Sequence, residues 1–176
     1  LETVPGYNHA YRQDRPEGLT VGVLGNIGPQ KGSAIVGSLV ETAKRDTENK
    51  ISKVVVLGRL DRVSAFDWPS VVHGPYEIEN IPSLVQRYGI DIWLIPSIWP
   101  ETFSYATHEC LATGLPVYAF DLGAQGEAVA AAPNGHVMAL PQHPVPHKEL
   151  ASNVLRAITA SHYSVLVPER VASYIR

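Results

Sequence analysis

Residues 90–120 constrain the fold of this chain more than any other stretch, because they join four recognisable pieces in one order. An apolar run over 90–95 stops at Pro96, a loop follows, apolar residues recur with helical spacing over 103–113, and a second β-type run occupies 116–120. The order is strand, loop, helix, strand. In a parallel α/β sheet, such a unit places the loop and the helix N-terminus at the carboxyl edge of the sheet, where ligands usually bind.

The two ends of the central helix carry their own signals. Gly114 stands where a left-handed residue commonly follows a helix, and Pro116 comes where the helix can no longer continue. Thr102 and Ser104 mark the start of the helix. The free backbone N–H groups there, together with the positive end of the helix dipole, favour an anion or a hydroxyl-rich ligand.

Two carboxylates flank this helix start. Glu101 lies just before the helix, and Glu109 lies eight residues further on. Eight residues at about 100° each return to within roughly 80° of the same side, which leaves the two groups about 12 Å apart. Both carboxylates could therefore face one ligand.

The rest of the chain alternates strands with helices, which predicts an α/β fold with a doubly wound, Rossmann-like parallel sheet. We expect a linker or N-terminal arm over 1–18, one domain over 19–160, and a C-terminal helix or tail over 161–176. The other predicted strands are 19–26, 54–57, 71–72 and 135–140; the other predicted helices are 32–45, 81–88, 126–132 and 148–160, with a loop over 121–127.

Length and composition set the outer limits. A chain of 176 residues with 45% hydrophobic residues suffices for one domain with a core. The net charge of −3 offers no basic field, so we expect no nucleic-acid partner. No apolar run of 18 residues occurs, so we expect no membrane span. The single cysteine, Cys110, suits a reducing cytosol, and we expect it to act as a small buried apolar group.

The first loop, 25–33, follows a strand and opens a helix, so its amides and Lys31 could cradle a diphosphate. Its order, Lys-Gly-Ser, is not that of a Walker A loop, and it lacks the G-x-G-x-x-G pattern. On spacing alone, a plain turn with a solvated lysine explains the loop equally well.

A family resemblance helps to decide between these interpretations. The spacing Glu101-x7-Glu109, followed by Ala-Thr-Gly-Leu-Pro-Val over 112–117, resembles the E-x7-E signature of retaining glycosyltransferases of family 4, also called group 1. In that family the signature belongs to the C-terminal, nucleotide-sugar-binding half of a GT-B fold. The resemblance covers about residues 19–160.

The resemblance implies a role for each candidate residue. Glu109 would contact the ribose hydroxyls of the donor, and Glu101 would contact hydroxyls of the transferred sugar. Lys31 and nearby amides would hold the diphosphate as it leaves, so that Lys31 and Glu101 are the expected catalytic residues. The full set of expected donor-binding residues is Asn26, Gly28, Lys31, Gly32, His73, Tyr76, Glu101, Phe103, Ser104, Tyr105, Glu109 and Glu127. Residues 73–76 would cradle the base, and Glu127 would belong to a partly preserved loop after the next strand.

The chain departs from the family at two places. Asn26 stands where the family has an arginine that helps to hold the diphosphate, and a neutral amide cannot supply that charge. Arg59, after the second long strand, either compensates or is an ordinary surface arginine. Thr102 and Ser104 stand where the family usually has glycine.

The resemblance implies a metal-independent reaction, and the residues indicate no cofactor and no metal site. His108-Glu109 does not continue as H-E-x-x-H, because position 112 is alanine. We expect an acceptor, such as a glycan of a polysaccharide pathway, to be bound by an N-terminal domain that this chain lacks, and we expect a cytoplasmic location, with attachment to the inner membrane face left open. The alternative function is a non-catalytic, Rossmann-like binding module derived from a degenerate glycosyltransferase.

Overall fold

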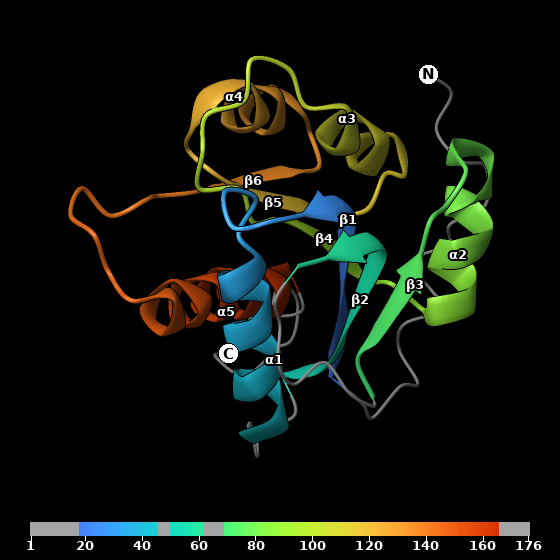
Figure 1. The fold of residues 1–176 in the computed structure, drawn as a ribbon, viewed down its shortest axis with the longest axis horizontal. Coiled ribbons are helices and arrows are strands. Elements are labelled where there is room, and N and C mark those ends of the chain that lie inside the picture. Colours follow the sequence, from blue (N-terminus) through green and yellow to red (C-terminus); the bar gives the residue numbers. More distant parts are fainter. Residues whose placement is uncertain (1–17, 46–49, 62–68, 166–176) are drawn as a thin grey trace, which may run out of the picture.

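A computed structural model describes residues 18–45, 50–61 and 69–165. In that part of the chain, six strands form one sheet in the order β3-β2-β1-β4-β5-β6, and every neighbouring pair is parallel (Figure 1). The strands are β1 Leu19–Ile27, β2 Ile51–Leu60, β3 Val71–Gly74, β4 Ile92–Ile95, β5 Val117–Phe120 and β6 Gly135–Met138. The helices are α1 Ser33–Arg45, α2 Ile81–Tyr88, α3 Tyr105–Ala112, α4 Gly123–Ala131 and α5 His147–Val165, with a 3₁₀ turn over Ile78–Asn80. The predicted α/β class with a parallel sheet is confirmed.

Helices cover both faces of the sheet. On one face, α1 and α5 pack together over side chains such as Val23 and Leu94; on the other, α2, α3 and α4 pack over side chains such as Trp93 and Val117. The central strands are therefore buried on both sides, and all four residues of β4 and of β5 are buried. This burial explains why these strands read as continuous apolar runs in the sequence.

The strand order reverses between β1 and β4. From β1 the chain moves outward through β2 to β3, and it then returns to place β4 on the other side of β1 before moving on to β5 and β6. The loop that leaves β1 leads to α1 on one face of the sheet, and the loop that leaves β4 leads to α3 on the other. In open α/β sheets ligands bind at such a switch point, outside the carboxyl ends of the strands.

Local predictions and observed elements differ mainly at their ends. β2 spans Ile51–Leu60, longer than the predicted 54–57, because its ladder with β1 continues to the pair Ile27 and Leu60. α3 begins at Tyr105, after an extended Ser104, and ends before Gly114, whose φ of 75° confirms the predicted left-handed residue. The helix predicted over 148–160 runs on to Val165. The predictions for 1–17 and 166–176 lie outside the described residues.

The predicted loop over 121–127 is wrong, because helix α4 already begins at Gly123. Glycine and glutamine are common in surface loops, so the sequence of this stretch suggests a loop. In the folded chain, however, the Ala124 N–H donates to the carbonyl oxygen of Glu101 at 2.9 Å, and the Gln125 side chain is fully buried. These tertiary contacts start the helix earlier than its local sequence indicates.

None of the helices in the described part of the chain combines the length and the apolar character that crossing a bilayer requires.

Candidate functional site

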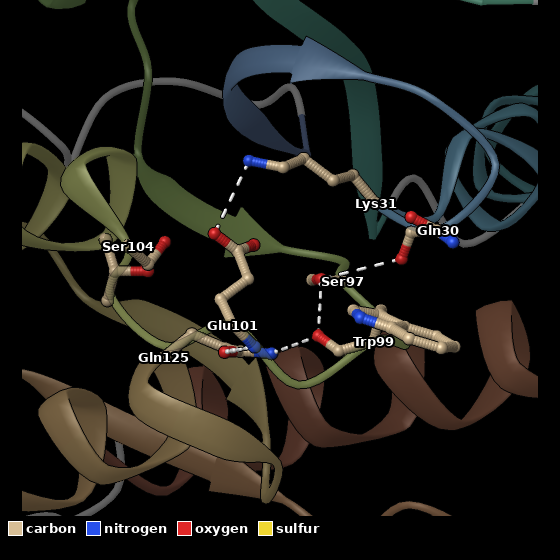
Figure 2. Close-up of polar contacts among 8 residues, drawn as sticks. Gln30, Lys31, Ser97, Trp99, Glu101, Ser104 and Gln125 are labelled. Atoms are coloured by element: carbon tan, nitrogen blue, oxygen red, sulfur yellow. Dashed lines mark hydrogen bonds and ion pairs between the residues drawn. The ribbon is translucent and has the colours of Figure 1, made fainter.

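Two predicted site residues meet at the switch point. Lys31 comes from the loop between β1 and α1, Glu101 comes from the loop between β4 and α3, and Lys31 Nζ lies 3.4 Å from Glu101 Oε2. Figure 2 shows the lysine side chain reaching toward the carboxylate from the neighbouring loop. The lysine side chain is 45% exposed and the glutamate 16%, so the pair faces solvent from one side.

The loop between β1 and α1, residues 28–32, is called the lysine loop, and it is shaped by backbone hydrogen bonds and by close packing. Gly32 N–H donates to the Pro29 carbonyl, and Ser33 N–H donates to the Gly28 carbonyl, both at 3.1 Å. Gly32 has a φ of +80°, and a Cβ at this position would lie 2.1 Å from the carbonyl oxygen of Pro96. Only glycine therefore lets the start of α1 lie directly against the loop that leads to Glu101.

The loop that carries Glu101 is held in turn by Gln125 of α4. Gln125 is fully buried, its Nε2 donates to the Trp99 carbonyl at 2.8 Å, and its Oε1 accepts from the Glu101 N–H at 3.1 Å (Figure 2). The two loops are also joined directly, because Ile98 N–H donates to the Gln30 carbonyl at 3.0 Å. Sequence analysis assigned Gln125 no role because it placed this residue in a loop over 121–127. The signal that it overlooked is a polar residue inside a Gly-rich stretch directly after a buried strand.

The N-terminus of α3 lies next along the chain. Ser104 occupies the N-cap position without a side-chain bond to the helix amides, because its hydroxyl instead accepts from Thr107 Oγ1 at 2.8 Å. Phe103 and Tyr105 are exposed and touch edge to face, and Phe103 also stacks on His108. The first amides of α3 thus follow Glu101 closely along the chain, and the exposed aromatic side chains lie next to them.

The second predicted carboxylate has a different partner. Tyr76, from the loop after β3, donates its phenolic hydroxyl to Glu109 Oε2 at 3.0 Å. Burial, the nearby Glu109 charge and this hydrogen bond together raise the pKa of Tyr76 well above its ordinary value of 10.0. The Tyr76 hydroxyl thus keeps its proton to higher pH than an ordinary tyrosine and donates a hydrogen bond to Glu109. Sequence analysis placed both residues in the site but did not predict their contact.

The remaining predicted residues are more scattered. His73 Nδ1 lies 2.8 Å from the Tyr88 hydroxyl, so this histidine is engaged with α2. Glu127 is exposed on α4, and it forms no hydrogen bond or ion pair with the other predicted site residues that the structure describes. Asn26 is exposed at the end of β1, and Gly28 is half-buried in the lysine loop.

Two hollows lie near the candidate residues. One, of about 420 Å³, lies over the ends of β1 and β2 and is lined by Asn26, Gly58, Arg59, Pro75 and Tyr76. The other, of about 450 Å³, is lined by Pro29, Gln30, Ser33, Ala34, Ile98, Trp99 and His147. Tyr76 lines the first hollow and donates to Glu109, so this hollow adjoins the second carboxylate. Lys31 with Glu101 at the switch point, and Tyr76 with Glu109 beside the first hollow, offer a cation and two carboxylates to polar ligand groups.

Within residues 18–45, 50–61 and 69–165, no three His, Cys, Asp or Glu side chains lie where they could hold a metal ion together.

Comparison with known proteins identifies the fold. No protein-family model matches the sequence, and no curated protein matches it significantly. Among solved structures, the C-terminal domain of a group 1 family glycosyl transferase (LpcC) from Francisella tularensis superposes with a TM-score of 0.56 at 17% identity, covering 96% of this chain and 94% of that domain.

Two longer chains match similarly. A glycosyltransferase from Rickettsia africae ESF-5 gives a TM-score of 0.56 at 18% identity, over 88% of this chain and 40% of that one. The GtfA/B complex gives 0.58 at 14% identity, over 90% of this chain and 31% of that one. The chain thus spans less than half the length of these two proteins. It has the Rossmann-like fold of the C-terminal half of GT-B glycosyltransferases, and at these identities the likeness is one of fold.

Proposed function

We propose that this chain is the donor-binding domain of a retaining glycosyltransferase and that it binds a nucleotide diphosphate-sugar at the switch point between β1 and β4. The observation that carries the proposal is the contact of Lys31 with Glu101 across the switch point. A cation for a phosphate and a carboxylate for hydroxyls stand side by side there, each on a loop that backbone hydrogen bonds hold in place.

The pair suggests how the donor is received. Lys31 is half-exposed and held by a single contact of 3.4 Å, and an ion pair of this kind contributes at most about 1 kcal/mol. A diphosphate carries more charge than one carboxylate and can take the lysine as its partner. Glu101 is then released to accept hydrogen bonds from hydroxyls of the sugar.

During transfer, negative charge develops on the departing diphosphate. Once the diphosphate has replaced Glu101 as its partner, the ammonium of Lys31 can stabilise that charge, together with the first amides of α3. We propose that this is the catalytic role of Lys31 and that the reaction needs no metal ion.

Glu109 completes the donor site in this proposal. Its carboxylate offers about four lone-pair sites, and Tyr76 occupies one of them. The rest can accept from the two neighbouring hydroxyls of a ribose, while residues 73–76 contact the base. A second domain would bind the acceptor, for example a glycan in polysaccharide synthesis, and the cytoplasm is the location that we propose.

A specific observation also supports a second candidate function. Asn26 is neutral at the end of β1, where the family that the sequence resembles has an arginine. A domain that had lost this charge and its catalysis would remain as a non-catalytic, Rossmann-like binding module.

A titration distinguishes the two functions. NMR spectra and melting temperatures of the chain are recorded with UDP, CDP, GDP, ADP and dTDP and with their sugars, with and without Mg²⁺. We expect one nucleotide to bind independently of Mg²⁺, with binding weakened at least tenfold in Lys31→Ala, because a charge-assisted contact to phosphate is lost.

The matched control is Lys148→Ala, an exposed lysine on α5 that lies 4.0 Å from Glu41. It should bind as the wild type does. Equal binding by Lys31→Ala and Lys148→Ala would contradict the role of Lys31, and no binding of any nucleotide diphosphate would favour the non-catalytic module.

A further inference from the structure

We propose that Arg59 supplies the second positive charge for the donor diphosphate, in the place that Asn26 leaves neutral. This inference rests on the proposed function, since it concerns the same ligand. It adds a diphosphate-binding residue on a different strand.

The register of the sheet places the two residues together. Asn26 and Arg59 stand opposite each other near the end of the β1–β2 ladder. The ladder ends one pair later, and Asp61 N–H then donates to the carbonyl of the last residue of β1. Asn26 and Arg59 both line the hollow of about 420 Å³, together with Gly58, Pro75 and Tyr76. A cation on β2 therefore faces the same space as the residue at the end of β1, although 33 residues separate them in the sequence.

The backbone of β2 is adapted at this point. Leu57 and Gly58 both pair with Gly74 of β3, which makes a bulge, and bulges turn side chains at the ends of strands. Gly58 has a φ of +129°, and a Cβ there would lie 2.1 Å from the Gly25 carbonyl oxygen. The strand thus needs glycine immediately before Arg59, because β1 and β2 approach so closely beside the hollow.

Arg59 is also available for a ligand. The residue is exposed, and no carboxylate in the described part of the chain forms an ion pair with it. The same hollow reaches Tyr76, which holds Glu109, the proposed ribose contact. Arg59 therefore shares a hollow with the tyrosine that orients the proposed ribose contact, and we place the phosphate joined to that ribose there.

The chemistry favours an anion over other ligands. A guanidinium donates two parallel hydrogen bonds to a phosphate and remains charged at every physiological pH, whereas an asparagine amide has no charge to offer. With the arginine on β2 instead of β1, the diphosphate would still meet two cations, Lys31 and Arg59.

The test measures the affinity of the chain for UDP, CDP, GDP, ADP and dTDP and for the corresponding uncharged nucleosides by NMR titration. For the nucleotide that binds, Arg59→Gln should weaken diphosphate binding about tenfold or more, because a charge-assisted contact is lost. Binding of the nucleoside should be unchanged. The matched control is Arg156→Gln, an exposed arginine of α5 that contacts Asn153 and should leave both affinities unchanged.

A relocation variant makes the test sharper. Asn26→Arg in the Arg59→Gln background returns the charge to the neighbouring strand, and recovery of diphosphate affinity would support the proposed position. If Arg59→Gln binds the diphosphate as the wild type does while Lys31→Ala does not, the role of Arg59 is refuted and the donor site stands. Equal losses for nucleoside and diphosphate would also refute it. If the wild type binds none of the five diphosphates, the donor site and the role of Arg59 fall together.

Discussion

The two carboxylates of the site are held in opposite ways. Glu101 has a fixed backbone, since its N–H and carbonyl are bonded to Gln125 and to the Ala124 amide, but its side chain pairs with a half-exposed lysine. Glu109 has a fixed side chain, held at 3.0 Å by a protonated tyrosine. We therefore expect Glu101 to exchange its partner when the proposed donor binds, whereas Glu109 is oriented beforehand.

The largest expected effect comes from breaking the scaffold on the Glu101 side. Gly32→Ala places a Cβ 2.1 Å from the Pro96 carbonyl oxygen and strains a φ of +80°. We expect a loss of about 3 kcal/mol or more in the free energy of unfolding, measured by urea denaturation, since a backbone clash cannot relax cheaply.

Gly114→Ala is the control for strain without a clash. Gly114 has a φ of +75° but nothing within 4 Å of the added Cβ, so its replacement should cost only about 1–2 kcal/mol. Equal losses in the two variants would show that α1 does not press on the Glu101 loop.

The next effect tests the fixed backbone of Glu101. Gln125→Ala removes a fully buried side chain and leaves the Glu101 N–H and the Trp99 carbonyl without their partner. We expect the free energy of unfolding to fall by about 2–3 kcal/mol, because buried polar groups lose their hydrogen bonds. We also expect donor affinity to fall.

Gln142→Ala provides the matched control, because this glutamine is exposed in the segment before α5. It should leave both stability and donor affinity unchanged. Wild-type donor affinity in Gln125→Ala would contradict the role of Gln125 in positioning Glu101.

A smaller effect is expected on the Glu109 side. Tyr76→Phe removes one hydrogen bond from a half-buried carboxylate that water can reach in part. The free energy of unfolding should fall by about 1 kcal/mol. Donor affinity should fall as well, because Glu109 is no longer oriented beforehand.

The pH dependence of the wild type checks the same hydrogen bond. The pKa of Tyr76 is raised in the folded chain, so the folded state keeps a proton that the unfolded state releases above about pH 10.0. Stability should therefore be lost as the pH rises above 10.0, and Tyr76→Phe should lose less of it. Tyr118, whose pKa burial also raises, is common to both proteins and cancels in the comparison. Identical pH profiles would show that Tyr76 is not held in this way.

The smallest effect on stability belongs to the exchangeable pair itself. Lys31→Ala should change the free energy of unfolding by no more than about 0.5 kcal/mol, because the pair faces solvent. Thermal denaturation at low and high salt measures this change. A loss as large as that of Gln125→Ala would mean that the pair is structural and that Lys31 is not free to take a phosphate.

Much of the fold follows from local patterns. The alternation of apolar runs with helical spacing determines the α/β class, since strands buried on both faces must be apolar throughout. The positions of Lys31 at a helix start and of Glu101 and Glu109 around a second helix start are likewise local, because they depend only on spacing along the chain. The left-handed Gly114 is also a local feature, because it follows from the end of one helix.

Contacts between distant residues were decided by the tertiary structure alone. The strand order places the loops of Lys31 and Glu101 side by side, and the β1–β2 register places Arg59 beside Asn26. Burial of Gln125 and the bond from Tyr76 to Glu109 likewise arise only when separate elements pack. The physical reason is that local periodicity determines which residues face a core, whereas strand order and register, which arise from the packing of the whole chain, determine which of them meet.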